Sequence, residues 1–272
     1  MIIKRILNNN AVMSVDESGE DIIVKGKGIA FQKKSGDEIN QNKIDKIFVI
    51  KNQEINRRYQ EILVHIPYDC INACEDMIDV IKANIHKELS DKIYVTLTDH
   101  IFNLLERVKM GIVFDNALLW DVKRLYREEY QAGLLVVEMI RELFDIKIED
   151  DEACFIALHI VNAQMNTEFK EVIEITTMID DVYDIVESCF DLNIDKDGLE
   201  YTRFIMHLRV FFERIINQQN IHSEKSQTLL KTLLKQYQCV LKILDYVSMK
   251  YDEALEGEIL YLLVHVIKLT EH

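Results

Sequence analysis

Four histidines, His100, His159, His207 and His265, are the residues best suited to carry chemistry in this chain. They form two pairs with nearly the same internal spacing, 59 residues in the first pair and 58 in the second. A neutral imidazole can ligate a metal, exchange protons or accept a phosphoryl group near pH 7. A histidine on an apolar helix can also be a packed core residue and nothing more. The residues around each pair must therefore decide between these uses.

Among these uses, the sequence favours the phosphoryl acceptor. No His-x-x-x-His or Glu-x-x-His motif accompanies the four histidines, so their spacing predicts no metal site. We find no nucleophile elbow, P-loop or catalytic carboxylate pair either, and therefore predict no catalytic residues and no cofactor. Phosphorylation replaces a neutral ring by about two negative charges, which can break or remake an interface. The histidines thus indicate a regulator rather than an enzyme.

The stretch 25–36, KGKGIAFQKKSG, is the second group of chemically distinctive residues. Gly26 and Gly28 allow a positive φ or a close approach of the backbone to a partner. Four lysines, the first of them Lys25, supply positive charge, and Phe31 offers a flat face on which an unpaired base can stack. The pattern suits a nucleic-acid contact, but on its own it favours a tight β-turn with solvated lysines and a core phenylalanine.

The composition is that of a mainly helical globular protein. The 272 residues include one proline and eight glycines, and 49% of them are hydrophobic. Both proline and glycine are disfavoured inside helices. No apolar run approaches the roughly 18 residues of a membrane span, no signal peptide opens the chain, and the five cysteines contain no Cys-x-x-Cys pair. We expect a cytoplasmic protein with free thiols and no stable membrane insertion.

Charge is unevenly distributed along the chain, whose net charge is −15. Residues 1–58 carry 11 Lys and Arg against 8 Asp and Glu, whereas the remaining residues carry 21 against 39. Because an acidic body repels nucleic acid, any contact with nucleic acid should be confined to the basic N-terminal segment.

An internal repeat organises the acidic part of the chain. The segment 100–108, HIFNLLERV, is similar to 207–215, HLRVFFERI, and 152–160, EACFIALHI, is similar to 258–266, EILYLLVHV. The histidines of the two copies are offset by 107 and 106 residues. The repeat predicts two homologous all-helical bundle domains, which we place at 65–170 and 171–272.

Residues 1–58 are interpreted as a small antiparallel β-sheet domain, because short apolar stretches alternate there with turn residues. The expected strands are 1–7, 11–15, 21–25, 28–32 and 46–50. A sheet of this size buries little surface, so we expect it to dimerise. Apolar spacing predicts a helix that begins after Pro67 and has a stripe from Cys70 to Ile85, then helices at about 94–109, 115–144, 151–163, 171–190, 198–217, 225–249 and 255–270. The fold class is α+β and mainly α.

The whole chain resembles the sugar-operon transcriptional antiterminators of the BglG/SacY/LicT type. The resemblance rests on Arg5 with 8–10, on the stretches 26–36, 97–100, 116–120 and 155–163, and on His207 and His265. It implies a homodimeric co-antiterminator domain that binds a leader-RNA hairpin and so blocks an overlapping terminator. It also implies two regulation domains of the phosphotransferase system (PTS).

By position, the resemblance implies eight RNA-contact residues: Arg5, Asn8, Asn10, Gly26, Lys27, Gly28, Phe31 and Gln32. The family often has arginine where this chain has Lys27, and lysine keeps the charge but lacks the planar, bidentate guanidinium. The resemblance also implies phosphorylation of all four histidines. In the family, a phosphorylated sugar-specific enzyme II typically inactivates through the first PTS domain, and the phosphocarrier HPr typically activates through the second.

Two other functions stay open at this point. A DNA-binding regulator could use the same phosphorylated domains, although residues 1–50 lack a helix-turn-helix pattern. A two-histidine metal hydrolase would be indicated by stoichiometric zinc in the purified protein. The partners that we expect are the antiterminator RNA hairpin, HPr, an enzyme II and a second copy of the chain, and we expect no DNA.

Overall fold

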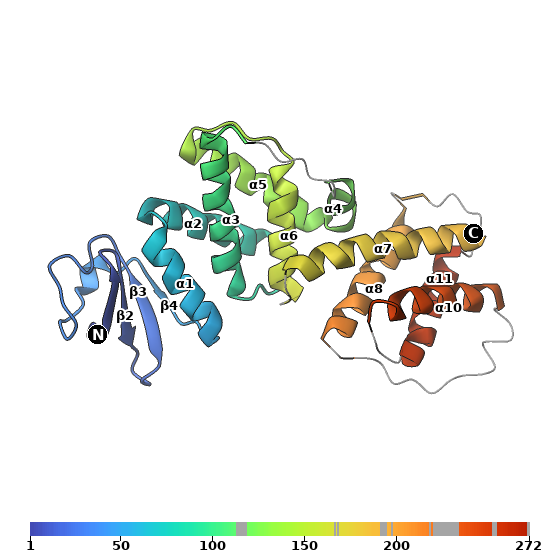
Figure 1. Cartoon of the computed structure of the whole chain (residues 1–272), viewed down its shortest axis with the longest axis horizontal. Coiled ribbons are helices and arrows are strands. Elements are labelled where there is room, and N and C mark those ends of the chain that lie inside the picture. Colours follow the sequence, from blue (N-terminus) through green and yellow to red (C-terminus); the bar gives the residue numbers. More distant parts are fainter. Residues whose placement is uncertain are drawn as a thin grey trace. The chain divides into compact units, whose positions relative to one another are not determined.

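The structure is a computed structural model, shown in Figure 1, and it describes residues 1–112, 119–165, 167, 169–190, 195–196, 198–217, 219, 234–251 and 255–270. The chain divides into two compact units. The first contains residues 1–117 and 128–166, and the second contains residues 118–127 and 167–272.

The N-terminal part of the first unit is a four-stranded antiparallel sheet with the strand order β1-β2-β3-β4 (blue in Figure 1). The strands are β1 (Arg5–Asn8), β2 (Ala11–Val15), β3 (Asp21–Lys25) and β4 (Lys46–Phe48). The predicted sheet is thereby confirmed. Because side chains alternate across a strand, one face carries Val12, Ile22 and Val24, which pack with Ile3, Ile29, Ala30 and Ile39 into an apolar core.

The expected strand at 28–32 is wrong, since these residues form consecutive turns. Gly28 has φ +64° and Gln32 has φ +58°, values that no extended strand adopts. The Ala30 amide donates to the Asn9 carbonyl at 3.1 Å, so the segment folds back against the β1–β2 turn. The expected strands 1–7 and 46–50 are shorter in the structure, where they are β1 and β4.

Three helices follow the sheet, and residues of the second sheet face pack against them. Helices α1 (Gln53–His65) and α2 (Tyr68–Asn84) are followed by α3 (Lys92–Lys109). The Phe48 ring on this face lies 5.1 Å from the Tyr59 ring of α1 and 5.3 Å from the Tyr94 ring of α3, between ring centroids. Ile23, which pairs with Phe48 across the sheet, is fully buried.

The helix predicted after Pro67 is confirmed as α2. Its predicted stripe is buried throughout: Cys70, Cys74, Met77, Ile78, Ile81 and, just beyond the helix end, Ile85. The first unit also contains α5 (Arg127–Phe144) and α6 (Glu152–Met165), and α3 packs directly on α6.

The second unit is helical. Its elements are α4 (Leu119–Leu125), α7 (Phe169–Phe190), α8 (Leu199–Ile216), α10 (Leu234–Ser248), the short 3₁₀ helix η2 (Leu255–Glu258) and α11 (Ile259–Thr270). The expected single helix at 115–144 is interrupted at Tyr126. This residue is fully buried, and its hydroxyl lies 3.1 Å from the hydroxyl of Thr176 on α7. Helix α4 therefore packs on α7. Residues 115–118 and 225–233 of the expected helices lie outside the described residues, as do 116–118 of the family-like stretch.

Within the described part of the chain, no helix is both long enough and apolar enough to cross a bilayer.

Candidate nucleic-acid interface and histidine sites

The structure builds a compact surface from the β1–β2 turn and the loop after β3, which we call the glycine-loop surface and define as Asn8, Asn10 and residues 26–32. The Asn10 backbone carbonyl accepts the Gly26 amide at 2.9 Å, and its side-chain oxygen accepts the Gly28 amide at 2.7 Å. The Asn8 side chain in turn accepts the Asn10 amide at 2.7 Å. These bonds hold the turn and the loop against each other.

Gly26 is required by the packing of this loop. A Cβ at position 26 would lie 1.6 Å from the carbonyl oxygen of Lys43, far inside van der Waals contact. The Lys43 ammonium lies 2.9 Å from the Gly28 carbonyl, to which it donates. Hydrogen bonds therefore hold the backbone of the loop from two sides, from Asn10 of the β1–β2 turn and from Lys43.

The glycine-loop surface presents a ring and positive charge to solvent. Phe31 is 59% exposed, so the core phenylalanine considered from the sequence is wrong. Lys27 and Gln32 are exposed beside it in the sequence. An exposed aromatic ring near a flexible cation on a rigid loop is a combination that binds unpaired bases and phosphates.

Two of the eight RNA-contact candidates are engaged by helix α1. The Arg5 guanidinium donates to the Gln60 side chain, and the Asn8 amide donates to the Leu63 carbonyl. Asn8 thus contacts both Asn10 of the β1–β2 turn and helix α1, whereas Arg5 contacts α1.

Lys25 does not contribute charge to this surface, contrary to expectation. Its ammonium is buried and contacts Glu75 at 2.5 Å and Asn72 at 2.6 Å, both on α2. Burial lowers the pKa of Lys25, and Glu75 opposes this effect. Tyr59 completes the group by donating to Glu75 at 2.8 Å. No local sequence pattern signals this pairing, because 50 residues separate Lys25 and Glu75.

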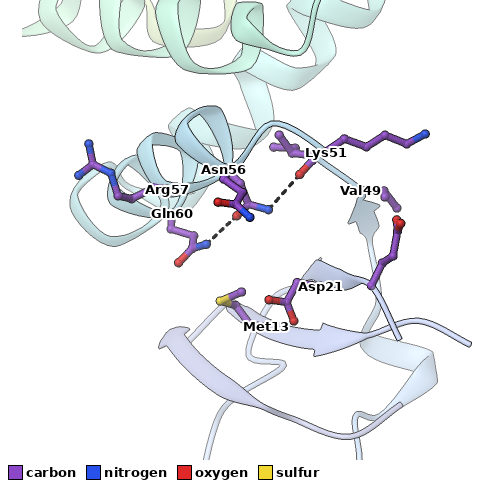
Figure 2. Close-up of a pocket in the computed structure, with 10 residues that line it drawn as sticks. Met13, Asp21, Val49, Lys51, Asn56, Arg57 and Gln60 are labelled. Atoms are coloured by element: carbon purple, nitrogen blue, oxygen red, sulfur yellow. Dashed lines mark hydrogen bonds between the residues drawn. The ribbon is translucent and has the colours of Figure 1, made fainter. Parts of the chain in front are cut away.

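A cavity of about 480 Å³ lies between the second sheet face and α1, and Figure 2 shows residues that line it. It is lined by Met13, Glu20, Asp21, Val49, Ile50, Lys51, Gln53, Asn56, Arg57 and Gln60. Asn56 spans its edge, where it donates to the Ile50 carbonyl at 3.2 Å and accepts from Gln60 at 2.6 Å. Because acidic and basic side chains both line the cavity, it favours neither an anion nor a cation.

The first histidine pair lies between two helices of the first unit. His100 on α3 and His159 on α6 have ring centroids 4.8 Å apart. Burial, and next the neighbouring His100, hold the pKa of His159 well below its ordinary value, so this ring is neutral at physiological pH. Glu152 Oε2 lies 3.5 Å from His100 Nε2, and the other oxygen of the same carboxylate lies 3.3 Å from Arg107.

The second pair is built the same way from two helices of the second unit. The rings of His207 on α8 and His265 on α11 are stacked, with centroids 3.5 Å and planes 18° apart. Burial lowers the pKa of both rings, that of His265 to about 4 with His207 as the next cause. The structure thus brings the four histidines together in the two pairs predicted from their spacing. The lowered pKa values of His159, His207 and His265 favour the neutral imidazole, which is the form suited to nucleophilic attack.

Arg214, Glu258 and Tyr261 surround the second pair and were missed as site residues. Arg214 contacts Glu258 at 2.5 Å and lies 4.3 Å from the centre of the Tyr261 ring. The repeat itself held the signal, because Arg follows each first histidine by seven residues and Glu precedes each second histidine by seven. Within the described residues, no three His, Cys, Asp or Glu side chains gather into a metal site.

Comparison with known proteins identifies both parts of the chain. The CAT RNA binding domain family matches residues 1–57, and the PRD domain family matches residues 75–163 and again 180–269. The chain is 36% identical to the transcription antiterminator LicT of Bacillus subtilis (strain 168), over all of this chain and 99% of that protein. It is 34% identical to the beta-glucoside operon antiterminator of Dickeya chrysanthemi, over 98% and 95% of the two chains. A crystal structure of GlcT CAT-PRDI, 31% identical, covers 60% of this chain and 97% of that chain with a TM-score of 0.52.

Proposed function

The chain belongs to the BglG/LicT family of transcriptional antiterminators, which are RNA-binding regulators controlled through PRD domains and not enzymes, and from this premise we propose that it binds a leader-RNA hairpin as a homodimer. Binding of the hairpin would keep the overlapping terminator from forming. We propose the head at 1–58 and the two regulation domains at 65–170 and 171–272. The protein would act in the cytoplasm.

The exposed Phe31 on the pinned loop is the observation that carries the RNA proposal. A ring that is 59% exposed gains little from folding, so a binding role accounts for its position better than packing does. The RNA contacts that we propose are Arg5, Asn8, Asn10, Gly26, Lys27, Gly28, Phe31 and Gln32. Arg5 and Asn8 would exchange their hydrogen bonds with α1 for RNA, and Gly26 and Gly28 would let the backbone approach the ribose-phosphate chain.

For the histidines we propose phosphorylation by the PTS, through a sugar-specific enzyme II and HPr. Paired imidazoles support this role because they are nucleophilic, and each pair belongs to a side-chain cluster that contains an arginine, Arg107 through Glu152 and Arg214 through Tyr261, whose positive charge would favour an added phosphoryl group. His100 and His159 would form the first site, and His207 and His265 the second. Added charge would shift the association of the helical domains and so switch RNA binding.

A binding experiment on the full chain tests the RNA proposal. A panel of RNA hairpins with bulged bases and a duplex DNA of the same length would be compared by gel shift at two salt concentrations, with and without HPr-dependent phosphorylation. We expect one or more bulged hairpins to stay bound to the protein at the higher salt concentration, and the duplex DNA to dissociate from it. DNA bound as tightly as the hairpins, or no hairpin bound in either phosphorylation state, would contradict the proposal.

A further inference from the structure

Tyr261 makes two hydrogen-bond contacts with one histidine. Its hydroxyl oxygen lies 3.1 Å from the backbone carbonyl oxygen of His207 and 3.2 Å from Nδ1 of the same residue. A carbonyl can only accept, so the single hydroxyl proton is directed to it. The hydroxyl oxygen can then only accept from Nδ1. This arrangement places the ring proton of His207 on Nδ1 and the lone pair on Nε2.

The hydroxyl is held in this position by its surroundings. Arg214 lies 4.3 Å above the centre of the Tyr261 ring, and the His265 ring packs against the same tyrosine with centroids 4.7 Å apart. Arg214 is itself fixed by Glu258, whose side chain is fully buried. A tyrosine ring packed against both Arg214 and His265 keeps its hydroxyl directed at His207, so the preference for one tautomer of His207 is built into the fold.

The first repeat lacks this device. Phe155 stands three residues after Glu152 as Tyr261 stands three after Glu258, and its ring lies 5.9 Å from the His100 ring, the same centroid distance as between Tyr261 and His207. Phenylalanine has no hydroxyl. The group that faces His100 Nε2 is instead the Glu152 carboxylate, whose Oε2 lies 3.5 Å away without making a hydrogen bond, and both atoms are closed to solvent. A negative charge beside Nε2 favours the proton of His100 on this nitrogen and its lone pair on Nδ1.

We propose that Tyr261 is a positioning residue that makes Nε2 of His207 the phosphoryl-accepting atom, whereas the first repeat offers Nδ1 of His100. The inference rests on the proposed phosphorylation. In the step at His207, the Nε2 lone pair forms a bond to phosphorus while the bond between phosphorus and the donor nitrogen breaks, and its electron pair leaves with that nitrogen. With phosphoramidate monoanion as donor, ammonia departs and the Nδ1 proton stays on the ring, hydrogen-bonded to Tyr261.

The two repeats would therefore present different ring nitrogens to their donors. A donor aligned for in-line transfer to one nitrogen is misaligned for the other, because the two lone pairs point in different directions in the ring plane. This difference supplies a physical basis on which two phosphoryl donors can distinguish repeats of similar sequence.

The test compares the full wild-type chain with Tyr261→Phe, both labelled with ¹⁵N-histidine. Tyr246→Phe is the matched control, because the Tyr246 hydroxyl contacts Asp181 on α7. Long-range proton–nitrogen NMR spectra distinguish protonated from bare ring nitrogens, and His207→Gln identifies the His207 signals. We expect the Nδ1–H form of His207 in the wild type and in Tyr246→Phe, and loss of this preference in Tyr261→Phe. A wild-type proton on Nε2, or an unchanged Tyr261→Phe spectrum, would show the inference to be wrong.

A second measurement treats the same proteins with phosphoramidate and identifies the phosphohistidine isomers by ³¹P NMR, with free histidine as the baseline. We expect phosphate on Nε2 of His207 and on Nδ1 of His100, and an isomer ratio at His207 that moves to the free-histidine value in Tyr261→Phe. Phosphate on Nδ1 of wild-type His207 would overturn the inference and leave the proposed function standing. If neither phosphoramidate nor phosphorylated HPr labels His207, the proposed phosphorylation fails at this residue and the inference fails with it, whatever the tautomer.

Discussion

The Lys25 ammonium lies 2.5 Å from the Glu75 carboxylate, and the two side chains are 1% and 5% exposed. The pair ties the last residue of β3 to α2. Removing one member leaves the other charge buried without compensation, so Lys25→Met should lower the free energy of unfolding by about 3–5 kcal/mol. Urea unfolding followed by circular dichroism measures this change.

The double variant Lys25→Met, Glu75→Gln should recover much of that loss, because glutamine is neutral and still accepts from Tyr59. Lys4→Met is the control. It removes a lysine from the pair with Asp21, in which the two side chains are 56% and 45% exposed, and should cost about 0–1 kcal/mol. A Lys25→Met variant as stable as Lys4→Met would contradict the assignment of a buried pair.

Phe31→Ala should weaken binding of the cognate RNA hairpin about 5- to 150-fold, the range that corresponds to the roughly 1–3 kcal/mol of one base–aromatic stack. The thermal unfolding midpoint should stay near that of the wild type, since the ring is 59% exposed. Ile47→Ala, at a residue 44% exposed on β4, is the control for loss of an exposed apolar group. Equal RNA affinity of both variants would remove Phe31 from the binding surface.

Gly26→Ala should damage the glycine-loop surface, because its Cβ would meet the Lys43 carbonyl at 1.6 Å. The backbone must move, and we expect a loss of about 1–3 kcal/mol in stability, together with weaker RNA binding. Gly19→Asn serves as the comparison. Gly19 has φ +87° with open space around it, and asparagine tolerates a positive φ better than most residues. Differential scanning calorimetry on both variants should show the larger loss for Gly26→Ala.

His100→Asp should weaken RNA binding in the full chain by about 5- to 150-fold, the span of a coupling energy of roughly 1–3 kcal/mol. The new charge would lie near Glu152, which is 3.5 Å from the present imidazole, and would imitate the charge of phosphorylation. His100→Asn removes the imidazole without adding charge and should bind more tightly than His100→Asp. Equal affinities of the two variants would argue against electrostatic gating.

The buried rings also predict an acid-sensitive fold. Burial, followed by the charges of His207, Lys268 and Arg214, lowers the pKa of His265 from its ordinary 6.5 to about 4. Between these two values the unfolded chain binds more protons than the folded chain, so stability falls as pH drops from about 6.5 to 4. His265→Gln should flatten this part of a plot of melting temperature against pH. A variant with the same pH dependence as the wild type would rule out His265 as the cause.

The sequence predicted the parts of the fold that depend on local periodicity. The stripe on α2 is buried from Cys70 to Ile81, because residues three and four apart share one helix face. The pairing of His100 with His159 and of His207 with His265 followed from an offset shared by two copies of one domain, which must place equivalent residues in equivalent positions.

What the sequence did not predict depends on contacts between distant residues. The segment 28–32 is apolar enough for a strand, but the hydrogen bonds of Asn9 and Asn10 fold it into turns. Lys25 is indistinguishable in the sequence from its neighbour Lys27, yet one is buried against Glu75 and the other is exposed. Helix 115–144 was expected to be continuous because its periodicity does not reveal that Tyr126 contacts Thr176.

The contacts of the second sheet face have a consequence for shortened versions of the protein. A chain that stops at residue 58 loses half of α1 and all of α2 and α3, so that Tyr59 and Tyr94 no longer cover Phe48, and Lys25 loses Glu75. Ile23 and Phe48 would then meet water unless another molecule replaced the missing helices. Such a truncated head should sediment as a larger species as its concentration rises, so dilution series belong in any study that isolates it.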